Sequence, residues 1–217
     1  MGTSNWQNIS YCVDLIRRIN PAKVLDVGIG FGRWGMICRE FLDVWNGRIY
    51  ESSWSTSIDG VEIFKNNISN YHFHFYNQIY NEDAYKFIKR TTEKYDLIIL
   101  GDVLEHFNKD IAIEILQESI SKSNYVLLNI PLGKYWKQDE LYGNKYERHL
   151  SFWRKKDLKK YKPVVSKQFR DEIFRTFGVF VFSKNQDRIG PTNYKVRLAL
   201  LLNQYPQFKR FLKKIIK

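Results

Sequence analysis

The chain has 217 residues, 44% of them hydrophobic and 16% aromatic, which is enough for one domain with a sizeable core and short for two. No run of about 18 apolar residues occurs, so the sequence excludes a membrane-spanning helix. The net charge of +12 is uneven: eight Lys or Arg and no acid lie within 188–217, which leaves +4 (12 − 8) for the rest. A mildly basic body argues against nucleic acid as a partner.

Apolar periodicity divides the chain into alternating helices and strands. The first half is predicted to contain a helix over Ile9–Ile19, a strand over Lys23–Gly28, a helix over Arg33–Trp45, a strand over Ser57–Ile63, a strand over His72–Tyr80 and a helix over Asn81–Thr91. The second half is predicted to contain a strand over Tyr95–Leu100, a helix over Asp110–Ile120, a strand over Asn124–Pro131, a short helix over Lys155–Tyr161, and an antiparallel pair over Lys162–Phe169 and Phe177–Lys184. This alternation favours a parallel sheet with helices on both faces. In this scheme His72 and His74 share an exposed face of the third strand.

Three glycines, Gly28, Gly30 and Gly32, alternate between the first strand and the next helix. Glycine loses more backbone entropy on folding than other residues, so a close approach of some ligand to the backbone is a reason to use it here. A strand, a glycine-rich turn and a helix form the geometry of a nucleotide-binding turn. Asp26 precedes the first glycine by two positions and completes the pattern D-x-G-x-G-x-G.

Acidic residues follow the next strands of the expected sheet. Glu62 ends the second strand, where a carboxylate can accept hydrogen bonds from both hydroxyls of a ribose. Asp83 follows the third strand and can accept a hydrogen bond from an adenine amino group. The segment "YDLIILGDVLEH" places Asp102 after the fourth strand. An NAD-binding domain would share the glycines and the first acid, but hydride transfer would not need Asp83 or the "DVLEH" segment.

With these motifs the chain resembles the class I S-adenosylmethionine (SAM)-dependent methyltransferases. The matching stretches are "VLDVGIGFG", "DGVEIF", "EDA" and "YDLIILGDVLEHF", and the resemblance extends over 9–183. The family implies a Rossmann-like, doubly wound sheet of about seven strands, mostly parallel with the last strand antiparallel, in a three-layer α/β/α sandwich. It also implies that SAM is the cofactor.

The resemblance assigns roles to residues on the cofactor side. It implies that the backbone at Gly28, Gly30 and Gly32 approaches the amino-acid part of SAM, with Asp26 and Gly101 beside it. It further implies that Glu62 binds the ribose, that Asp83 and the Ala84 amide bind the adenine, and that Ile63 packs on one face of the ring. One departure is an insertion over 45–57, which separates Gly32 from Glu62 by thirty positions and makes Glu51 the rival ribose ligand.

Two segments are expected to form the acceptor side. Asp102 and His106 follow the fourth strand, and 138–153, which includes Glu147 and His149, follows the fifth. A hydroxyl acceptor needs a base, and residues two apart in an extended segment face the same side. Glu147 and His149 therefore fit a base with its orienting carboxylate, or a metal pair with His106 and Asp102 as further ligands. We assign His149, His106, Glu147 and Asp102 to catalysis and no residue to a metal. Glu105 is expected to be structural.

The C-terminal segment has a separate character. Phe208, Phe211, Leu212, Ile215 and Ile216 recur at helical spacing, with Lys and Arg on the other face. We therefore divide the chain into a methyltransferase domain over 1–187 and a basic amphipathic helical tail over 188–217. The pattern predicts that 195–217 binds an anionic membrane surface, although a helix docked on the protein's own body remains an alternative.

The pattern "GNxxExHxSxW" in 143–153 resembles small methyltransferases of bacterial surface-polysaccharide gene sets. It implies O-methylation of a sugar hydroxyl in a surface glycan or its lipid-linked precursor, with a glycan or small molecule as acceptor. The alternatives are a small-metabolite methyltransferase with an N- or O-acceptor, and a non-catalytic cofactor-binding scaffold. Cys12 and Cys38 indicate buried, reduced thiols in a cytoplasmic protein, which the tail would place at the inner face of the membrane.

Overall fold

The computed structural model describes residues 5–190 and contains a single seven-stranded sheet in the order β3-β2-β1-β4-β5-β7-β6. The strands are β1 (Lys23–Val27), β2 (Ser57–Val61), β3 (Gln78–Tyr80), β4 (Tyr95–Gly101), β5 (Ser123–Pro131), β6 (Val165–Arg170) and β7 (Thr176–Ser183). β7 pairs antiparallel with both β5 and β6, while β1 to β5 pair in parallel. The prediction of a mostly parallel sheet with an antiparallel last strand is confirmed.

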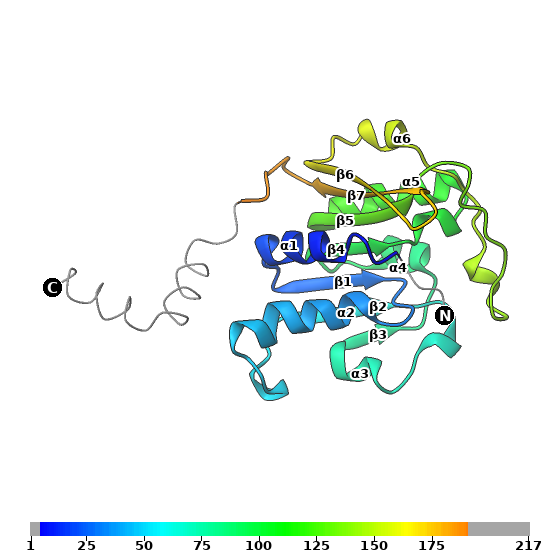
Figure 1. Cartoon of the computed structure of the whole chain (residues 1–217). Coiled ribbons are helices and arrows are strands. Elements are labelled where there is room, and N and C mark those ends of the chain that lie inside the picture. Colours follow the sequence, from blue (N-terminus) through cyan, green and yellow to red (C-terminus); the bar gives the residue numbers. More distant parts are fainter. Residues whose placement is uncertain (1–4, 191–217) are drawn as a thin grey trace.

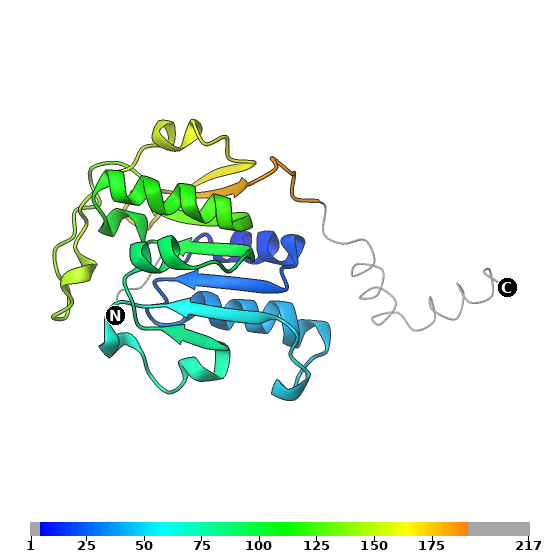
Figure 2. The same ribbon diagram turned by 180° about the vertical axis from the view of Figure 1, so that it is seen from behind.

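Helices cover both faces of this sheet. They are α1 (Ile9–Ile19), α2 (Arg33–Cys38), α3 (His72–Phe75), α4 (Ala84–Arg90), α5 (Lys109–Lys122) and α6 (Lys155–Lys159). Six short turns of helix accompany them: η1 (Arg39–Asp43), η2 (Val44–Asn46), η3 (Glu51–Ser53), η4 (Lys65–Asn67), η5 (Leu104–His106) and η6 (Lys145–Glu147). α1 and α2 lie in front of the sheet in Figure 1, and α4 and α5 lie in front of it in Figure 2, which is the view from behind. The three-layer α/β/α sandwich is therefore confirmed.

Strand alternation divides the interior into two apolar cores. Val24 of β1 faces the core that contains α1 and α2, whereas Leu25 faces the core that contains α4 and α5. In β4, Leu97 and Ile98 face opposite cores in the same way. Because successive side chains of a strand point to opposite faces, a strand buried on both faces is a continuous apolar run. This explains why the sequence predicts these strands well.

The third strand is shorter than predicted, and its first half is a helical turn. The sequence predicts a strand over His72–Tyr80, but α3 occupies His72–Phe75 and only Gln78–Tyr80 is β3. The imidazole of His72 accepts a hydrogen bond from Ser69 N (3.0 Å) at Nδ1 and donates one to Gly30 O (3.1 Å) at Nε2. These side chain–backbone bonds fix a turn that an alternating pattern alone does not predict. His72 is fully buried, so the expectation of an exposed strand face was wrong.

The insertion that precedes β2 is attached to the body by a buried ion pair. Arg39 donates to Asp43 at 2.5 Å, and both side chains are almost fully buried. Arg39 also donates to Thr56 O at 2.8 Å, and Asp43 accepts from Ser55 N at 2.9 Å. Since each charge has several partners, the pair ties the C-terminal end of the inserted segment to η1. The inserted segment does not displace β2 or the turn that follows it.

Beyond β7 the described chain folds back onto α1. Ile189 is buried in the core of that face, and Arg18 donates to Ile189 O (3.0 Å) and Gly190 O (2.8 Å). The predicted membrane-binding segment 195–217 lies outside the described residues. No helix within 5–190 combines the length and apolar character needed to cross a bilayer.

Candidate active site

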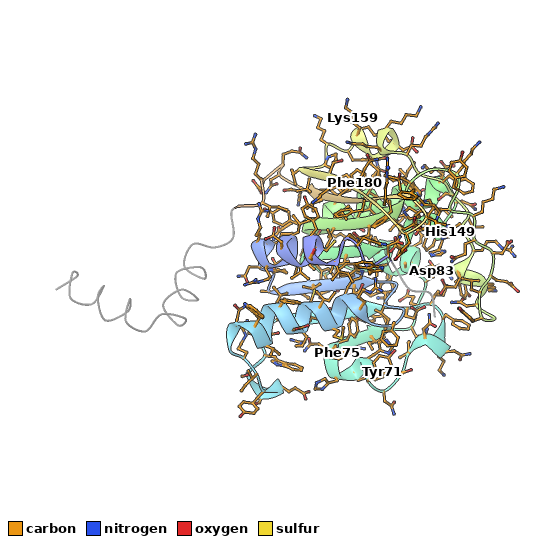
Figure 3. The ribbon with its side chains drawn as sticks, in the orientation of Figure 1. Tyr71, Phe75, Asp83, His149, Lys159 and Phe180 are labelled. Atoms are coloured by element: carbon orange, nitrogen blue, oxygen red, sulfur yellow. The ribbon has the colours of Figure 1, made fainter. Side chains whose placement is uncertain are left out.

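A cavity of about 470 Å³ opens at the carboxyl ends of the parallel strands. The crossover connections leave β1 and β4 on opposite faces of the sheet, and ligands of open α/β sheets bind at this switch point. Figure 3 shows Asp83 and His149 at this end of the sheet. The lining includes most of the expected site residues: Gly28, Gly30, Glu62, Ile63, Asp83, Ala84, Gly101, Asp102, His106, Glu147 and His149. Asp26 and Gly32 are not part of the lining.

The turn between β1 and α2 requires glycine for conformation and for space. Gly28 has φ 72° and Gly32 has φ 82°, a region that residues with a Cβ rarely adopt. A Cβ on Gly28 would lie 2.8 Å from Val103 Cγ2, and one on Gly32 would lie 2.7 Å from His72 Cδ2. Gly28 therefore forms the cavity floor at close approach, whereas Gly32 shapes the turn from behind.

Glu62 joins the glycine turn to the end of β2. Its Oε2 accepts from Gly30 N at 3.0 Å, and its Oε1 accepts from Phe64 N at 2.8 Å. Burial raises the pKa of the Glu62 carboxyl, and the two backbone hydrogen bonds oppose that shift. Each carboxylate oxygen has a second acceptor position, so Glu62 can brace the turn and still accept from ribose hydroxyls.

Asp26 supports the turn from the α2 side of the sheet. The Tyr76 hydroxyl donates to Asp26 Oδ2 at 2.6 Å and accepts from Gly35 N at 3.2 Å. Asp26 is fully buried, and burial raises the pKa of its carboxyl to about 7, against the opposing effect of the Tyr76 hydrogen bond. Through Tyr76, Asp26 is therefore connected to α2, the helix that follows the glycine turn. Sequence reasoning did not single out Tyr76, because it lay within the segment expected to be a strand.

On the opposite wall Asp83 is the N-cap of α4. Its Oδ1 accepts from Lys86 N at 3.0 Å, the bond expected of an N-cap carboxylate. This cap uses one carboxylate oxygen, so Oδ2 can accept a hydrogen bond from an amino group in the cavity. Ala84 is buried beside it and Ile63 is half-buried. The arrangement suits the edge and one face of an adenine ring.

The backbone bends sharply after β4. Asp102 has φ 56°, and its N–H donates to Asn129 O at 3.0 Å. A left-handed conformation in a residue other than glycine is uncommon and is concentrated at functional sites. The bend leads directly into η5, which presents Glu105 and His106 to the cavity.

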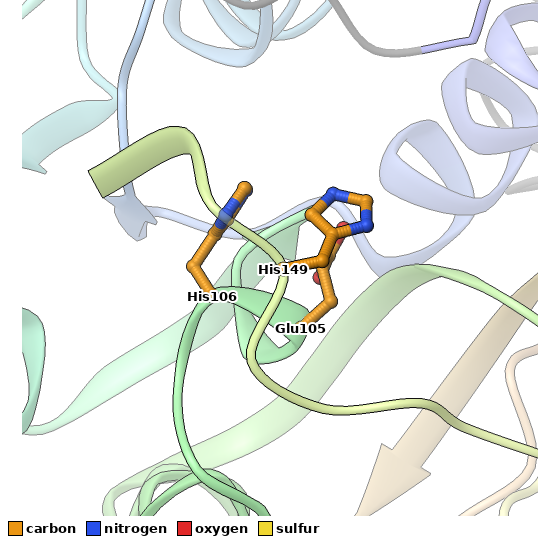
Figure 4. A group of neighbouring side chains, drawn as sticks. All are labelled: Glu105, His106 and His149. Carbon is orange, nitrogen blue, oxygen red and sulfur yellow. The ribbon is translucent and has the colours of Figure 1, made fainter. Parts of the chain in front are cut away.

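Two imidazoles meet where η5 and the loop after η6 line the cavity. The ring centroids of His106 and His149 lie 5.0 Å apart in an edge-to-face arrangement (Figure 4). Nδ1 of His106 donates to Arg148 O at 3.2 Å, and Nδ1 of His149 donates to Trp136 O. Because a carbonyl only accepts, these bonds place the proton on Nδ1 and the lone pair on Nε2. Burial lowers the pKa of both imidazoles, and the charge of His149 adds to the shift at His106.

Glu147 lines the same cavity but does not have the orienting bond that we expected. The Trp136 carbonyl binds Nδ1 of His149, so the backbone takes the role that the sequence assigned to Glu147. Glu147 Oε1 instead accepts from Asn144 Nδ2 at 3.3 Å, and Gln138 Nε2 donates to Glu147 O at 2.7 Å. Glu147 thereby helps to fix the loop that contains His149.

Glu105, which we expected to be structural, is a residue of the cavity lining. Its side chain lines the cavity and is 1% exposed, and its backbone carbonyl accepts from Leu150 N (2.8 Å) and Ser151 N (3.1 Å). Burial, reinforced by the nearby charge of Asp102, holds the pKa of the Glu105 carboxyl well above its usual range. The available signal was its position next to His106 in "DVLEH", directly after the fourth strand.

Comparison with known proteins agrees with this geometry. The family model described as "Methyltransferase domain" matches residues 7–161. No curated protein matches the chain. Among solved structures, TehB from Haemophilus influenzae is similar with a TM-score of 0.57 and 18% identity over 81% of this chain and 62% of that chain. The chain thus spans less than two thirds of the length of that protein.

Two further structures share the fold. A SAM-dependent methyltransferase from Archaeoglobus fulgidus has a TM-score of 0.56 and 16% identity, covering 81% of this chain and 90% of that chain. The N-terminal domain of EvdMO1, in the presence of S-adenosylhomocysteine (SAH) and D-fucose, has a TM-score of 0.56 and 14% identity, covering 83% of this chain and 84% of that chain. Because the family model matches residues 7–161, which is most of this chain, the chain belongs to the methyltransferase domain family.

Proposed function

We propose that this enzyme transfers the methyl group of SAM to a sugar hydroxyl, in a surface glycan or in its lipid-linked precursor. The observation that carries the proposal is the pair of imidazoles, His106 and His149, which meet at the cavity and each bind a backbone carbonyl through Nδ1. A hydroxyl acceptor must lose a proton as its oxygen attacks, so a neutral imidazole lone pair suits it. A nitrogen acceptor has less need of such a group.

The cofactor half of the cavity supports SAM binding in the orientation that the resemblance implies. Glu62 would accept from the ribose hydroxyls, Asp83 from the adenine amino group, and Gly28 and Gly30 would line the amino-acid part. When bound, SAM supplies a methyl carbon activated by its sulfonium. The acceptor oxygen forms a bond to that carbon as the carbon–sulfur bond breaks, and the hydroxyl proton leaves toward the imidazole side.

The rim of the cavity supports a sugar as the acceptor. Trp136, Tyr142 and Tyr146 contribute to the lining, and Tyr142 is 83% exposed. Aromatic faces pack well against the apolar faces of pyranose rings, while hydroxyls of the same rings remain free for polar contacts. The EvdMO1 domain was crystallised with D-fucose, which makes a sugar acceptor a reasonable choice for the first experiments.

A peripheral position at the inner face of the membrane is part of the proposal. It rests on the sequence pattern of 195–217, in which basic and apolar residues occupy opposite helical faces. A lipid-linked acceptor would be presented at that surface. A cytoplasmic location follows from the same reasoning and from the reduced state expected for Cys12 and Cys38, which are both buried and unpaired.

The test is a transfer assay with isotopically labelled SAM and a panel of acceptors. The panel contains alkyl glycosides, nucleotide sugars, polyprenyl-linked oligosaccharides and, as the competing class, small amines and phenols. We expect label in a sugar product from the wild type and a loss of at least about 100-fold in His149→Gln, in which SAH binding is retained. Label only in the amine or phenol products would overturn the sugar assignment.

A further inference from the structure

Three side chains on the acceptor side form a cluster that the proton-transfer role does not explain. One ligand atom each from Glu105, His106 and His149 lies within 4.8 Å of the others. Figure 4 shows the two imidazoles reaching the same space from separate segments, with Glu105 behind His149. Glu105 and His106 come from η5, and His149 comes from the loop after η6. Two imidazoles and one carboxylate are the donor set of many catalytic metal centres.

The hydrogen bonds around the two imidazoles suit metal ligation. His106 and His149 each use Nδ1 to donate to a backbone carbonyl, that of Arg148 and that of Trp136. Metal-binding histidines generally have this arrangement, because the bond at one nitrogen fixes the ring and directs the lone pair of the other toward the ion. Both rings are therefore oriented before any ion binds.

The carboxyl group of Glu105 offers an unused oxygen as a ligand. The side chain is buried, and within the described part of the chain its Oε2 has no hydrogen-bond partner. Asp102 and Glu147 lie close enough to add negative charge at this position. A buried carboxyl group beside other negative charges is neutral in the absence of a cation, and a cation that binds there would displace its proton.

The two segments that supply the ligands are fixed to each other. Leu150 N and Ser151 N both donate to Glu105 O, at 2.8 and 3.1 Å, and Ser151 Oγ donates to Leu104 O at 3.3 Å. Trp153 Nε1 in turn donates to Ser151 Oγ at 3.0 Å. These bonds hold the His149 segment beside η5, so the three donors converge without further rearrangement.

We propose that Glu105, His106 and His149 bind a divalent first-row transition-metal ion such as Zn²⁺ or Mn²⁺. Two nitrogen donors favour such an ion over Mg²⁺ or Ca²⁺, which prefer oxygen ligands alone. Because all three residues line the cavity, the remaining coordination positions are open to water or to an acceptor oxygen. Sequence reasoning assigned no residue to a metal, although it left open a metal pair of Glu147 and His149 with His106 and Asp102 as further ligands.

The ion would change how the acceptor hydroxyl is activated in the proposed function. Binding of the ion itself does not depend on which acceptor the enzyme uses. A hydroxyl bound to the metal is more acidic than a free one. His106 and His149 would then activate the acceptor through the ion, and the hydroxyl proton would pass to water in the cavity instead of to an imidazole.

Metal binding is tested on the full chain without a polyhistidine tag, after treatment with a chelator. Calorimetric titrations with ZnCl₂, MnCl₂ and MgCl₂ are compared for the wild type, Glu105→Gln and His149→Gln. The matched control is His74→Gln, an exposed histidine of α3. We expect saturable binding of Zn²⁺ or Mn²⁺ at one site, weakened more than about tenfold in both site variants and unchanged in the control. Co²⁺ should give a visible spectrum that the site variants lose.

SAH binding, measured on every variant, separates the possible outcomes. If Glu105→Gln fails to bind SAH as well as metal, its fold is disturbed and the comparison rests on His149→Gln. Equal metal affinity in the wild type and both site variants, binding of Mg²⁺ alone, or no binding at all would overturn the metal site. With SAH binding intact, any of these results leaves the methyltransferase function standing. No SAH binding by the wild type would contradict the proposed cofactor site itself.

Discussion

At the scale of single residues, Glu62 combines two tasks that are usually considered separately. It fixes the glycine turn through Gly30 N and the start of the next loop through Phe64 N. Its remaining acceptor positions face a cavity that suits a ribose. Sequence could predict the second task from the position of Glu62 at a strand end. It could not predict the first, because the thirty-residue spacing from Gly32 gives no indication of contact.

Replacement of Glu62 by alanine should weaken SAH binding strongly. The variant loses the acceptor for the ribose hydroxyls and the brace on the turn, and a charge-assisted hydrogen bond contributes about 1.5–3 kcal/mol. This corresponds to roughly 10- to 100-fold in Kd by calorimetry. The matched control is Glu51→Ala, the rival acid, which lies exposed in η3 away from the cavity. Equal losses in both variants would argue against the assignment.

Asp26 should make stability depend on pH. Its pKa is raised from 3.8 to about 7, so between about pH 4 and pH 7 the folded protein retains a proton that the unfolded chain has released. The unfolded state then binds fewer protons, and the free energy of unfolding falls as pH rises through this window, by up to about 1.4 kcal/mol per pH unit.

The variant Asp26→Asn should lack this slope, because its side chain does not titrate. Urea unfolding of wild type and variant at pH 5, 6, 7 and 8 gives the difference between their free energies of unfolding. Titrating groups that the two proteins share contribute equally to both and cancel in this difference. We expect the variant to gain stability relative to the wild type as pH increases toward 7. Parallel profiles for the two proteins would show that Asp26 does not titrate in this range.

At the scale of elements, burial decided which predictions succeeded. β1 and β4 are apolar on both faces, and their sequence runs could be interpreted without knowledge of their partners. α3 was misassigned because the alternating "HFHF" suits a half-buried strand, while the hydrogen bonds of His72 to Ser69 and Gly30 stabilise a turn. The second of those partners is far away in sequence, and periodicity contains no information about it.

The contact between α2 and Tyr76 should be sensitive to a single methyl group. A Cβ on Gly35 would lie 2.2 Å from Tyr76 Cζ, and the Tyr76 ring is buried and bound to Asp26. Gly35→Ala should therefore destabilise the fold by about 1–3 kcal/mol, as overpacking commonly does. Gly190→Ala is the control, since no heavy atom lies within 4 Å of its added Cβ. Thermal unfolding measures the effect, and equal melting temperatures for the two variants would contradict the predicted clash with Tyr76.

At the scale of the whole molecule, sequence could place the site residues at the strand ends more easily than those of η5 and the loop after η6. The glycine turn, Glu62 and Asp83 follow consecutive strands, so sheet topology alone brings them together. The acceptor residues come from η5 and from a long loop, and their mutual position depends on hydrogen bonds such as Leu150 N to Glu105 O. No spacing rule predicts such a bond, so the importance of Glu105 could be found only in three dimensions.

The C-terminal segment should act as a membrane anchor that can be removed. Each basic residue near an anionic surface contributes about 1 kcal/mol, so the full chain should sediment with vesicles containing phosphatidylglycerol and be released by salt. A chain ending at residue 190 should remain in the supernatant and bind SAH as the full chain does. Neutral phosphatidylcholine vesicles are the control. Equal sedimentation of both chains would place the membrane contact on the body or exclude it.

The loop that contains His149 begins and ends at neighbouring points of the structure. Leu132 and Trp153 form an isolated bridge, and Gly133 N donates to Trp153 O at 2.8 Å. The entropy of closing such a loop depends only weakly on its length, at about 0.6 kcal/mol for each doubling. Substitution by a longer or shorter segment would thus cost the fold little. Under the proposed function, exchange of this one segment should change the acceptor while the sheet and the residues at the strand ends keep their places.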